Sequence, residues 1–106
     1  MYASGHSPQL REVAHAVIDE GEGTTYVVTK AICEAAGVPS VFECAWLTVM
    51  VHTALDGVGL TAVLSRALAD AQIPCNVLAG YHHDHLLVPW ERADEAVAVL
   101  EGLRTA

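Results

Sequence analysis

The sequence predicts an α/β fold of the α+β class, and three patterns in its second part carry that prediction. Residues 46–52 alternate as a strand does, with bulky side chains on both faces. Residues 60–71 repeat apolar side chains at the spacing of an amphipathic helix. Two short strand-like runs, 73–79 and 86–88, precede a final run with helical spacing after Pro89. The predicted order is therefore β-α-β-β-α.

The segment before this unit predicts a hairpin and a short helix. Residues 13–18 and 24–28 are rich in β-prone side chains, and the acidic, glycine-bearing connection between them is typical of a hairpin. Thr29 can cap a short helix that ends at Gly37. These elements form a ββα half-unit.

The five-element order is that of a ferredoxin-like βαββαβ unit without its last strand, so the predicted sheet has an open edge. We expect the preceding hairpin to pair there and complete the sheet. The aperiodic, polar composition of residues 1–10 predicts a flexible tail. The expected organisation is a tail at 1–10, the half-unit at 11–42 and the βαββα domain at 43–106.

Both helices of the domain are expected to bury one apolar face against the sheet. Pro74 should end the first helix, because proline cannot continue a helix. The face that the second helix is expected to bury consists of Ala93, Ala96, Val97, Leu100 and Leu103.

The strand at 46–52 is apolar on both faces. Leu47 and Val49 share one face with Val51, while Trp46 and Met50 lie on the other. A sheet in a two-layer fold buries only one face, so something else must cover the second. A second copy of the chain could do so, which predicts a homodimer with Trp46 and Met50 in its interface.

Composition and charge exclude several classes of function. The 106 residues include 13 acidic and 5 basic side chains, and the resulting charge of -8 would repel phosphate backbones, so nucleic acid is excluded as a partner. No apolar run approaches the roughly 20 residues of a membrane span, and no basic cluster would attract a membrane surface. Three cysteines without paired spacing, and no secretory signal in the first ten residues, predict a cytoplasmic protein with reduced thiols.

Three stretches resemble known proteins. Asp56-Gly57-Val58-Gly59-Leu60, followed by an alanine-rich helix and Ile73-Pro74-Cys75-Asn76-Val77, resembles the signature of the ACT domain family. The segment from Leu78 to Pro89 and the acidic hairpin from Asp19 to Thr25 resemble small bacterial ACT-like proteins related to the arginine-sensing tandem ACT proteins. The resemblance implies a self-associating, non-catalytic regulatory domain that binds a small molecule, with an amino acid as its ligand class and no cofactor.

The turn before the amphipathic helix is the candidate ligand site. A helix begins with N–H groups that have no partner in the helix and with partial positive charge, which suits a carboxylate, while Asp56 could bind an ammonium group. Alternatively, Asp56 only caps the helix. The resemblance adds Asn76, and it adds His52, which lies two residues farther from the turn than in serine-binding members. The predicted ligand residues are His52, Asp56, Gly57, Val58, Gly59, Leu60 and Asn76.

Two other functions remain open at this point. His82, His83 and His85 are metal-ligand types and could serve a metal-binding protein or a metal-dependent enzyme. Alternation along a strand would send His82 and Asp84 to one face and the other two to the opposite face, which favours a turn in which Asp84 accepts backbone hydrogen bonds. Cys75 is expected to be an inert, buried thiol. The remaining alternative is a structural dimerisation module that binds no ligand.

Overall fold

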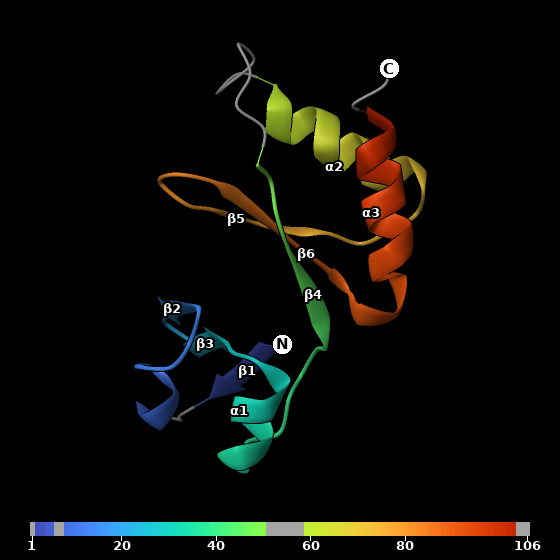
Figure 1. The fold of residues 1–106 in the computed structure, drawn as a ribbon. Helices are drawn as coiled ribbons and strands as arrows, with labels where there is room; N and C mark the ends of the chain where they lie inside the picture. The colour runs from blue at the N-terminus through green and yellow to red at the C-terminus, as the bar shows by residue number, and fades with distance from the viewer. Residues whose placement is uncertain (1, 6–7, 51–58, 104–106) are drawn as a thin grey trace. The chain divides into compact units, whose positions relative to one another are not determined.

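The computed structural model describes residues 2–5, 8–50 and 59–103, and the chain divides into two compact units, Met1–Glu43 and Cys44–Ala106. Figure 1 traces the elements of both units along the chain. No helix in the described ranges is both long and apolar enough to cross a membrane.

The first unit is built on a three-stranded antiparallel sheet in the order β1-β3-β2. The predicted hairpin is confirmed, because β2 pairs with β3 through a turn at Gly21 and Glu22. The elements are β1 (Tyr2–Gly5), the 3-10 turn η1 (Pro8–Leu10), β2 (Ala16–Glu20), β3 (Gly23–Val27) and α1 (Lys30–Ala35).

Two expectations for this unit are corrected by the structure. Residues 2–5 form β1, which pairs with β3, and Leu10 is only 1% exposed, whereas the composition of residues 1–10 predicted a tail. Strand pairing uses backbone groups that every residue carries, so polar composition does not exclude it. β1 pairs with the free edge of β3. The described hairpin strands belong to this sheet and, contrary to expectation, do not complete the second one.

The core of the first unit lies where α1 and η1 pack near β3. Its buried side chains are Leu10, Tyr26, Val28 and Cys33. The Thr29 hydroxyl oxygen accepts a hydrogen bond from the Ile32 backbone N–H at 3.2 Å, which confirms the predicted cap. Gly37 follows the helix with φ +68° and so allows the chain to leave α1 in the left-handed conformation that glycine adopts without strain.

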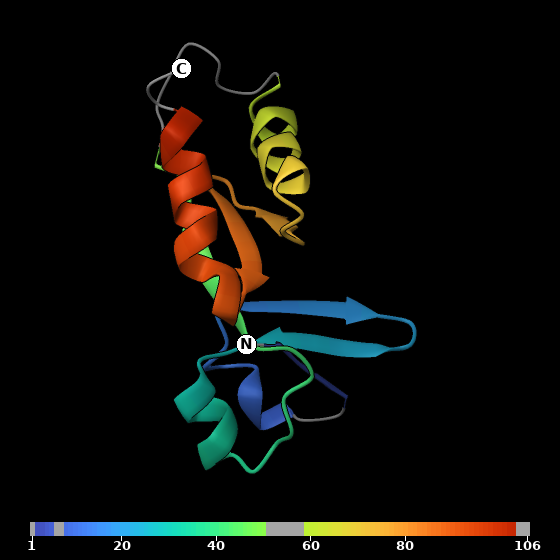
Figure 2. The same ribbon diagram turned by 90° about the vertical axis from the view of Figure 1, so that its right-hand side faces the viewer.

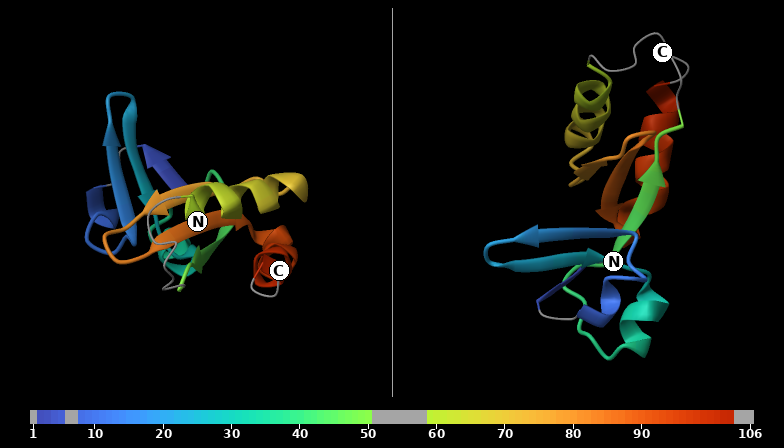
Figure 3. Two further views of the ribbon diagram at one scale, coloured as in Figure 1. Left: turned by 90° about the horizontal axis from the view of Figure 1, so that it is seen from above. Right: turned by 90° about the vertical axis from the view of Figure 1, so that its left-hand side faces the viewer.

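The second unit confirms the predicted β-α-β-β-α order and the α+β class. Its antiparallel sheet has the order β4-β6-β5. Both helices cover the same face, because residues of α2 and α3 share one buried cluster with Leu86 and Val88 of β6. Figures 2 and 3 show the elements of this unit from three further directions. The elements are β4 (Cys44–Thr48), α2 (Leu60–Asp70), β5 (Asn76–Ala79), β6 (Asp84–Pro89), the 3-10 turn η2 (Trp90–Arg92) and α3 (Ala93–Gly102).

The core of the second unit lies between the sheet and its two helices. Leu68 of α2, Val88 of β6 and Ala96 of α3 are fully buried there. Val97 was predicted to join them but is 42% exposed, because it is rotated by about 100° around α3 from Ala96. The buried members of the cluster are Ala45, Leu64, Leu68, Ile73, Leu86, Val88 and Ala96.

The end of α2 is closed by backbone hydrogen bonds before Pro74 is reached. The N–H of Gln72 donates to the Ala69 carbonyl and the N–H of Ile73 to the Leu68 carbonyl, both at 2.9 Å, which is a Schellman motif. Gln72 occupies its left-handed position with φ +59°. The Arg92 guanidinium donates to the carbonyl of Gln72 at 3.3 Å and thus also holds this helix end.

The hairpin of the first unit carries an exposed ion pair. Arg11 Nη2 and Asp19 Oδ1 lie 2.7 Å apart, and the Thr24 hydroxyl donates to the same oxygen at 3.0 Å. The hydrogen bond from Arg11, followed by that from Thr24, lowers the pKa of Asp19. Both partners are exposed, so the pair contributes little to stability.

We predict that Gln72→Gly stabilises the second unit. Glycine removes the cost of about 1–2 kcal/mol that other residues incur in the left-handed region, and it adds about 0.5–1 kcal/mol of backbone entropy to the unfolded chain. The free energy of unfolding should therefore rise by about 0.5–1 kcal/mol. Urea unfolding measures the change, and Gln72→Ala, which keeps a β-carbon at this position, should show no such gain.

We predict that Arg11→Gln raises the pKa of Asp19, because the charged donor is lost. A carboxyl with a lowered folded-state pKa stabilises the fold above its unfolded pKa, and this contribution disappears as the pH falls through the folded value. The free energy of unfolding of the variant should therefore change slightly less between neutral and acidic pH than that of the unsubstituted chain. A carboxyl NMR titration measures the change, with Glu95 as internal control, since its own lowered pKa depends on Arg92. An unchanged pKa of Asp19 would contradict the prediction.

Candidate functional site

The predicted ligand site is only partly covered by the described residues. His52, Asp56, Gly57 and Val58 lie outside them. Gly59 is the N-cap residue of α2, with φ +87° and no side chain to accept a hydrogen bond from the first turn. Leu60 is the first residue of the helix and packs partly against the core. The structure therefore shows the helix side of the predicted site.

Asn76 lies on the opposite face of the sheet from α2. It pairs across strands with Leu87, which in turn pairs with Trp46. Directly opposed residues share a face, and Leu86, next to Leu87 along β6, is the one that packs toward the helices. Asn76 is exposed. The structure therefore separates Asn76 from the beginning of α2 instead of bringing the two together.

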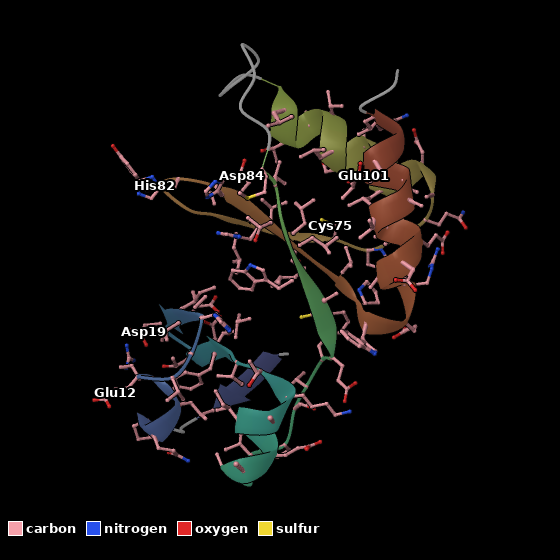
Figure 4. All side chains as sticks on the ribbon, viewed as in Figure 1. Glu12, Asp19, Cys75, His82, Asp84 and Glu101 are labelled. Atoms are coloured by element: carbon pink, nitrogen blue, oxygen red, sulfur yellow. The ribbon has the colours of Figure 1, made fainter. Side chains whose placement is uncertain are left out.

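Asp84 is the side chain that the structure brings to the beginning of α2. It is the first residue of β6 and is half-buried, and Figure 4 labels it beside the β5–β6 turn that carries His82. The Thr61 hydroxyl, in the first turn of α2, donates to Asp84 Oδ2 at 3.4 Å. The N–H of Val49, just after β4, donates to the Asp84 carbonyl at 2.9 Å. Three segments of the unit therefore meet at Asp84.

This position differs from the turn role predicted for Asp84, and the sequence carries no local signal of it. Thr61 and Asp84 are 23 residues apart, and only the order β4-β6-β5 brings the start of β6 to the start of α2. Chemically, the helix start offers N–H groups to an anion, and the nearby carboxylate can bind a cation. The combination matches the two charges of a free amino acid.

The three histidines of the alternative metal site do not converge. The rings of Tyr81 and His82 meet edge to face at a centroid distance of 4.9 Å, and His82 is exposed. His85 bonds instead to side chains of β4. Across residues 8–50 and 59–103, no three His, Cys, Asp or Glu side chains are arranged to hold a metal ion. Within this part of the chain, the predicted histidine site is therefore not assembled.

Trp46, Thr48 and His85 form a hydrogen-bonded cluster on the sheet face opposite the helices. The Trp46 indole N–H lies 3.1 Å from His85 Nδ1 and 3.2 Å from the Thr48 hydroxyl oxygen. The Thr48 oxygen and His85 Nδ1 are 3.1 Å apart. The two rings are tilted, with centroids 4.7 Å apart. We call these three residues the outer-face cluster.

Gly80 lies in the β5–β6 turn, where neighbouring atoms leave no room for a side chain. Its N–H donates to the His83 carbonyl at 2.9 Å. A β-carbon added at Gly80 would lie 2.8 Å from that carbonyl oxygen and 3.4 Å from His85 Nε2. The close approach of backbone and imidazole therefore requires a residue without a side chain at this position.

Cys75 borders an open hollow at the far end of α2, together with Gln72 and Pro74. It is half-buried, and burial raises the pKa of its thiol. A raised pKa leaves little reactive thiolate at neutral pH. Cys75 is therefore a poor nucleophile, in agreement with its expected inert role.

The residues predicted to form an interface differ in exposure. Met50 is 63% exposed, whereas Trp46 is half-buried in the outer-face cluster. The strand β4 begins at Cys44, before the predicted start at residue 46, and ends at Thr48, while residues 51 and 52 of the predicted strand lie outside the described residues. The role of Trp46 and Met50 in self-association stays a prediction.

Comparisons with known proteins place this architecture in a family. Residues 41–102 match a family model described as an ACT domain, which is more than half of the chain. A crystal structure of a Vibrio cholerae protein of unknown function, described as a possible transport protein, is 33% identical and superimposes with a TM-score of 0.84. The match covers 95% of this chain and 80% of that one. No curated protein matches the chain.

We predict that Gly80→Ala destabilises the second unit by about 1–3 kcal/mol, the usual cost of forcing extra volume into a packed site. The cause is the contact with the His83 carbonyl, since backbone atoms cannot move aside as a flexible side chain does. Thermal unfolding measures it. Gly102→Ala is the matched control, because its β-carbon would meet no atom within 4 Å and alanine favours a helix. Equal effects of the two substitutions would contradict the prediction.

Proposed function

Because the chain belongs to the ACT domain family, whose members typically bind small molecules in a regulatory role, we propose that it is a non-catalytic module that binds an amino acid. The observation that carries this proposal is the meeting of Asp84 with the first turn of α2. We further propose that it groups with the ACT-like proteins related to the arginine-sensing tandem proteins, as the segment from Leu78 to Pro89 indicates.

The proposed ligand would place its two charged groups on two different features. Its carboxylate would accept hydrogen bonds from the N–H groups at the start of α2. Gly59 leaves room there for a close approach of the ligand and has no side chain that competes for these N–H groups. Its ammonium group would form an ion pair with the Asp84 carboxylate, which in the ligand-free structure accepts one long hydrogen bond from Thr61. Asp56, Gly57, Val58 and His52 remain proposed ligand residues from the sequence.

The proposed mode of action couples ligand binding to assembly of a homodimer. The supporting observation is the exposed Met50 just beyond β4, the strand that carries the half-buried Trp46. A ligand that binds one assembly state better than another shifts the population toward it. A cytoplasmic location is part of the proposal, supported by three cysteines that form no disulfide.

The proposal is tested by a thermal-shift panel of the twenty amino acids, common nucleotides and divalent metals. A ligand at 100 times its Kd should stabilise the folded chain by about 2.7 kcal/mol. Asp84→Asn should weaken binding at least tenfold, because the amide cannot pair with an ammonium charge, whereas Asp70→Asn at the exposed end of the same helix should not. Each variant is compared with its own ligand-free form.

The other outcomes discriminate between functions. A stabilising metal without an amino-acid response would favour metal binding, and a dimer in light scattering that responds to no ligand would identify a structural association module. A monomer at micromolar concentration, with and without ligand, would refute the assembly part alone. An amino-acid response that Asp84→Asn leaves intact would move the site away from Asp84.

A further inference from the structure

The outer-face cluster fixes which nitrogen of His85 carries a proton. An indole N–H can only donate a hydrogen bond, and it lies 3.1 Å from Nδ1 of His85. Nδ1 must therefore be an acceptor, which places the single proton of the neutral ring on Nε2. The Thr48 hydroxyl can both accept from the indole and donate to Nδ1, so it completes the cluster in this state.

Protonation of the ring removes this arrangement. A proton from solvent on Nδ1 turns that atom into a donor, and two donors then face one another at the Trp46–His85 contact. The Thr48 oxygen has two lone pairs and is the remaining acceptor of the cluster for both groups. The indole then keeps its hydrogen bond to Thr48, and its contact with the imidazole ring, at a centroid distance of 4.7 Å, is weakened.

We propose that the outer-face cluster is a proton-operated switch, in which protonation of His85 removes one of the two acceptors of the Trp46 indole, leaves Thr48 as the other, and so shifts the largest side chain on this face of the sheet. Histidine is the side chain that ordinarily changes charge between about pH 5 and 8. The switch needs no bound ligand.

Among the described residues of β4 and β5, the groups that face His85 carry no charge. From β4 it meets Thr48 and Trp46, and from β5 its directly opposed partner is the apolar Leu78. Asp84, the adjacent carboxylate on β6, is turned toward Thr61 on the helix side. The titratable groups of the neighbouring turn are His82 and His83, and His82 contacts Tyr81.

The test follows Trp46 alone in a Trp90→Phe background, since the chain has two tryptophans. The indole N–H resonance and the Trp46 emission should both change in a single one-proton transition between about pH 8 and 5. His85→Asn supplies an acceptor oxygen near the place of Nδ1 that does not titrate, so the transition should be lost. His82→Asn is the matched control and should retain it.

Two results would overturn the proposal. One is a transition of Trp46 that persists in His85→Asn. The other is a nitrogen spectrum of the folded protein at pH 8 in which His85 carries its proton on Nδ1, a result that is independent of behaviour in acid. Neither result depends on ligand binding or on assembly, so failure of the switch is distinguishable from failure of the proposed function.

Discussion

The alternation of side chains along β6 is the constraint on which the second unit depends. This strand is central in its sheet and pairs on both sides, so its residues 84 to 89 must serve two faces at once. Leu86 and Val88 point to the helices, while His85 and Leu87 point the other way. Asp84 begins the first series and reaches α2, and His85 begins the second and reaches Trp46. Adjacent residues thereby take part in two separate sites.

Local patterns in the sequence predicted most of the fold. Helical spacing gave α2 and α3, and the Thr29 cap followed from residue type alone. The expectation that the histidines lie on different faces of a strand followed from the alternation of its side chains. The bonds that define the candidate sites join residues 23 and 39 positions apart, and they depend on the strand order, which no local pattern encodes. The pairing of β1 was missed because backbone hydrogen bonding leaves little trace in composition.

The two units end a helix in the same way with different residues. Gly37 after α1 and Gln72 after α2 both occupy the left-handed position of a Schellman motif. Glycine does so freely, whereas glutamine stores strain there that the surrounding structure must offset. Arg92 donates to the carbonyls of Ala71 and Gln72, and the burial of Ile73 and Leu68 supplies the usual apolar contact of the motif. Side-chain packing and the hydrogen bonds from Arg92 therefore stabilise a backbone conformation that glutamine by itself disfavours.

The order β4-β6-β5 also has a consequence for synthesis of the chain. The first two of these strands to leave the ribosome, β4 and β5, do not pair with each other, and both wait for β6. Arg92, which holds the end of α2, emerges later still. Until then the second unit has two unpaired strands, and the end of α2 lacks its hydrogen bonds from Arg92. Unpaired strands promote non-native association. The second unit can therefore complete its fold only after β6 and Arg92 have been synthesised.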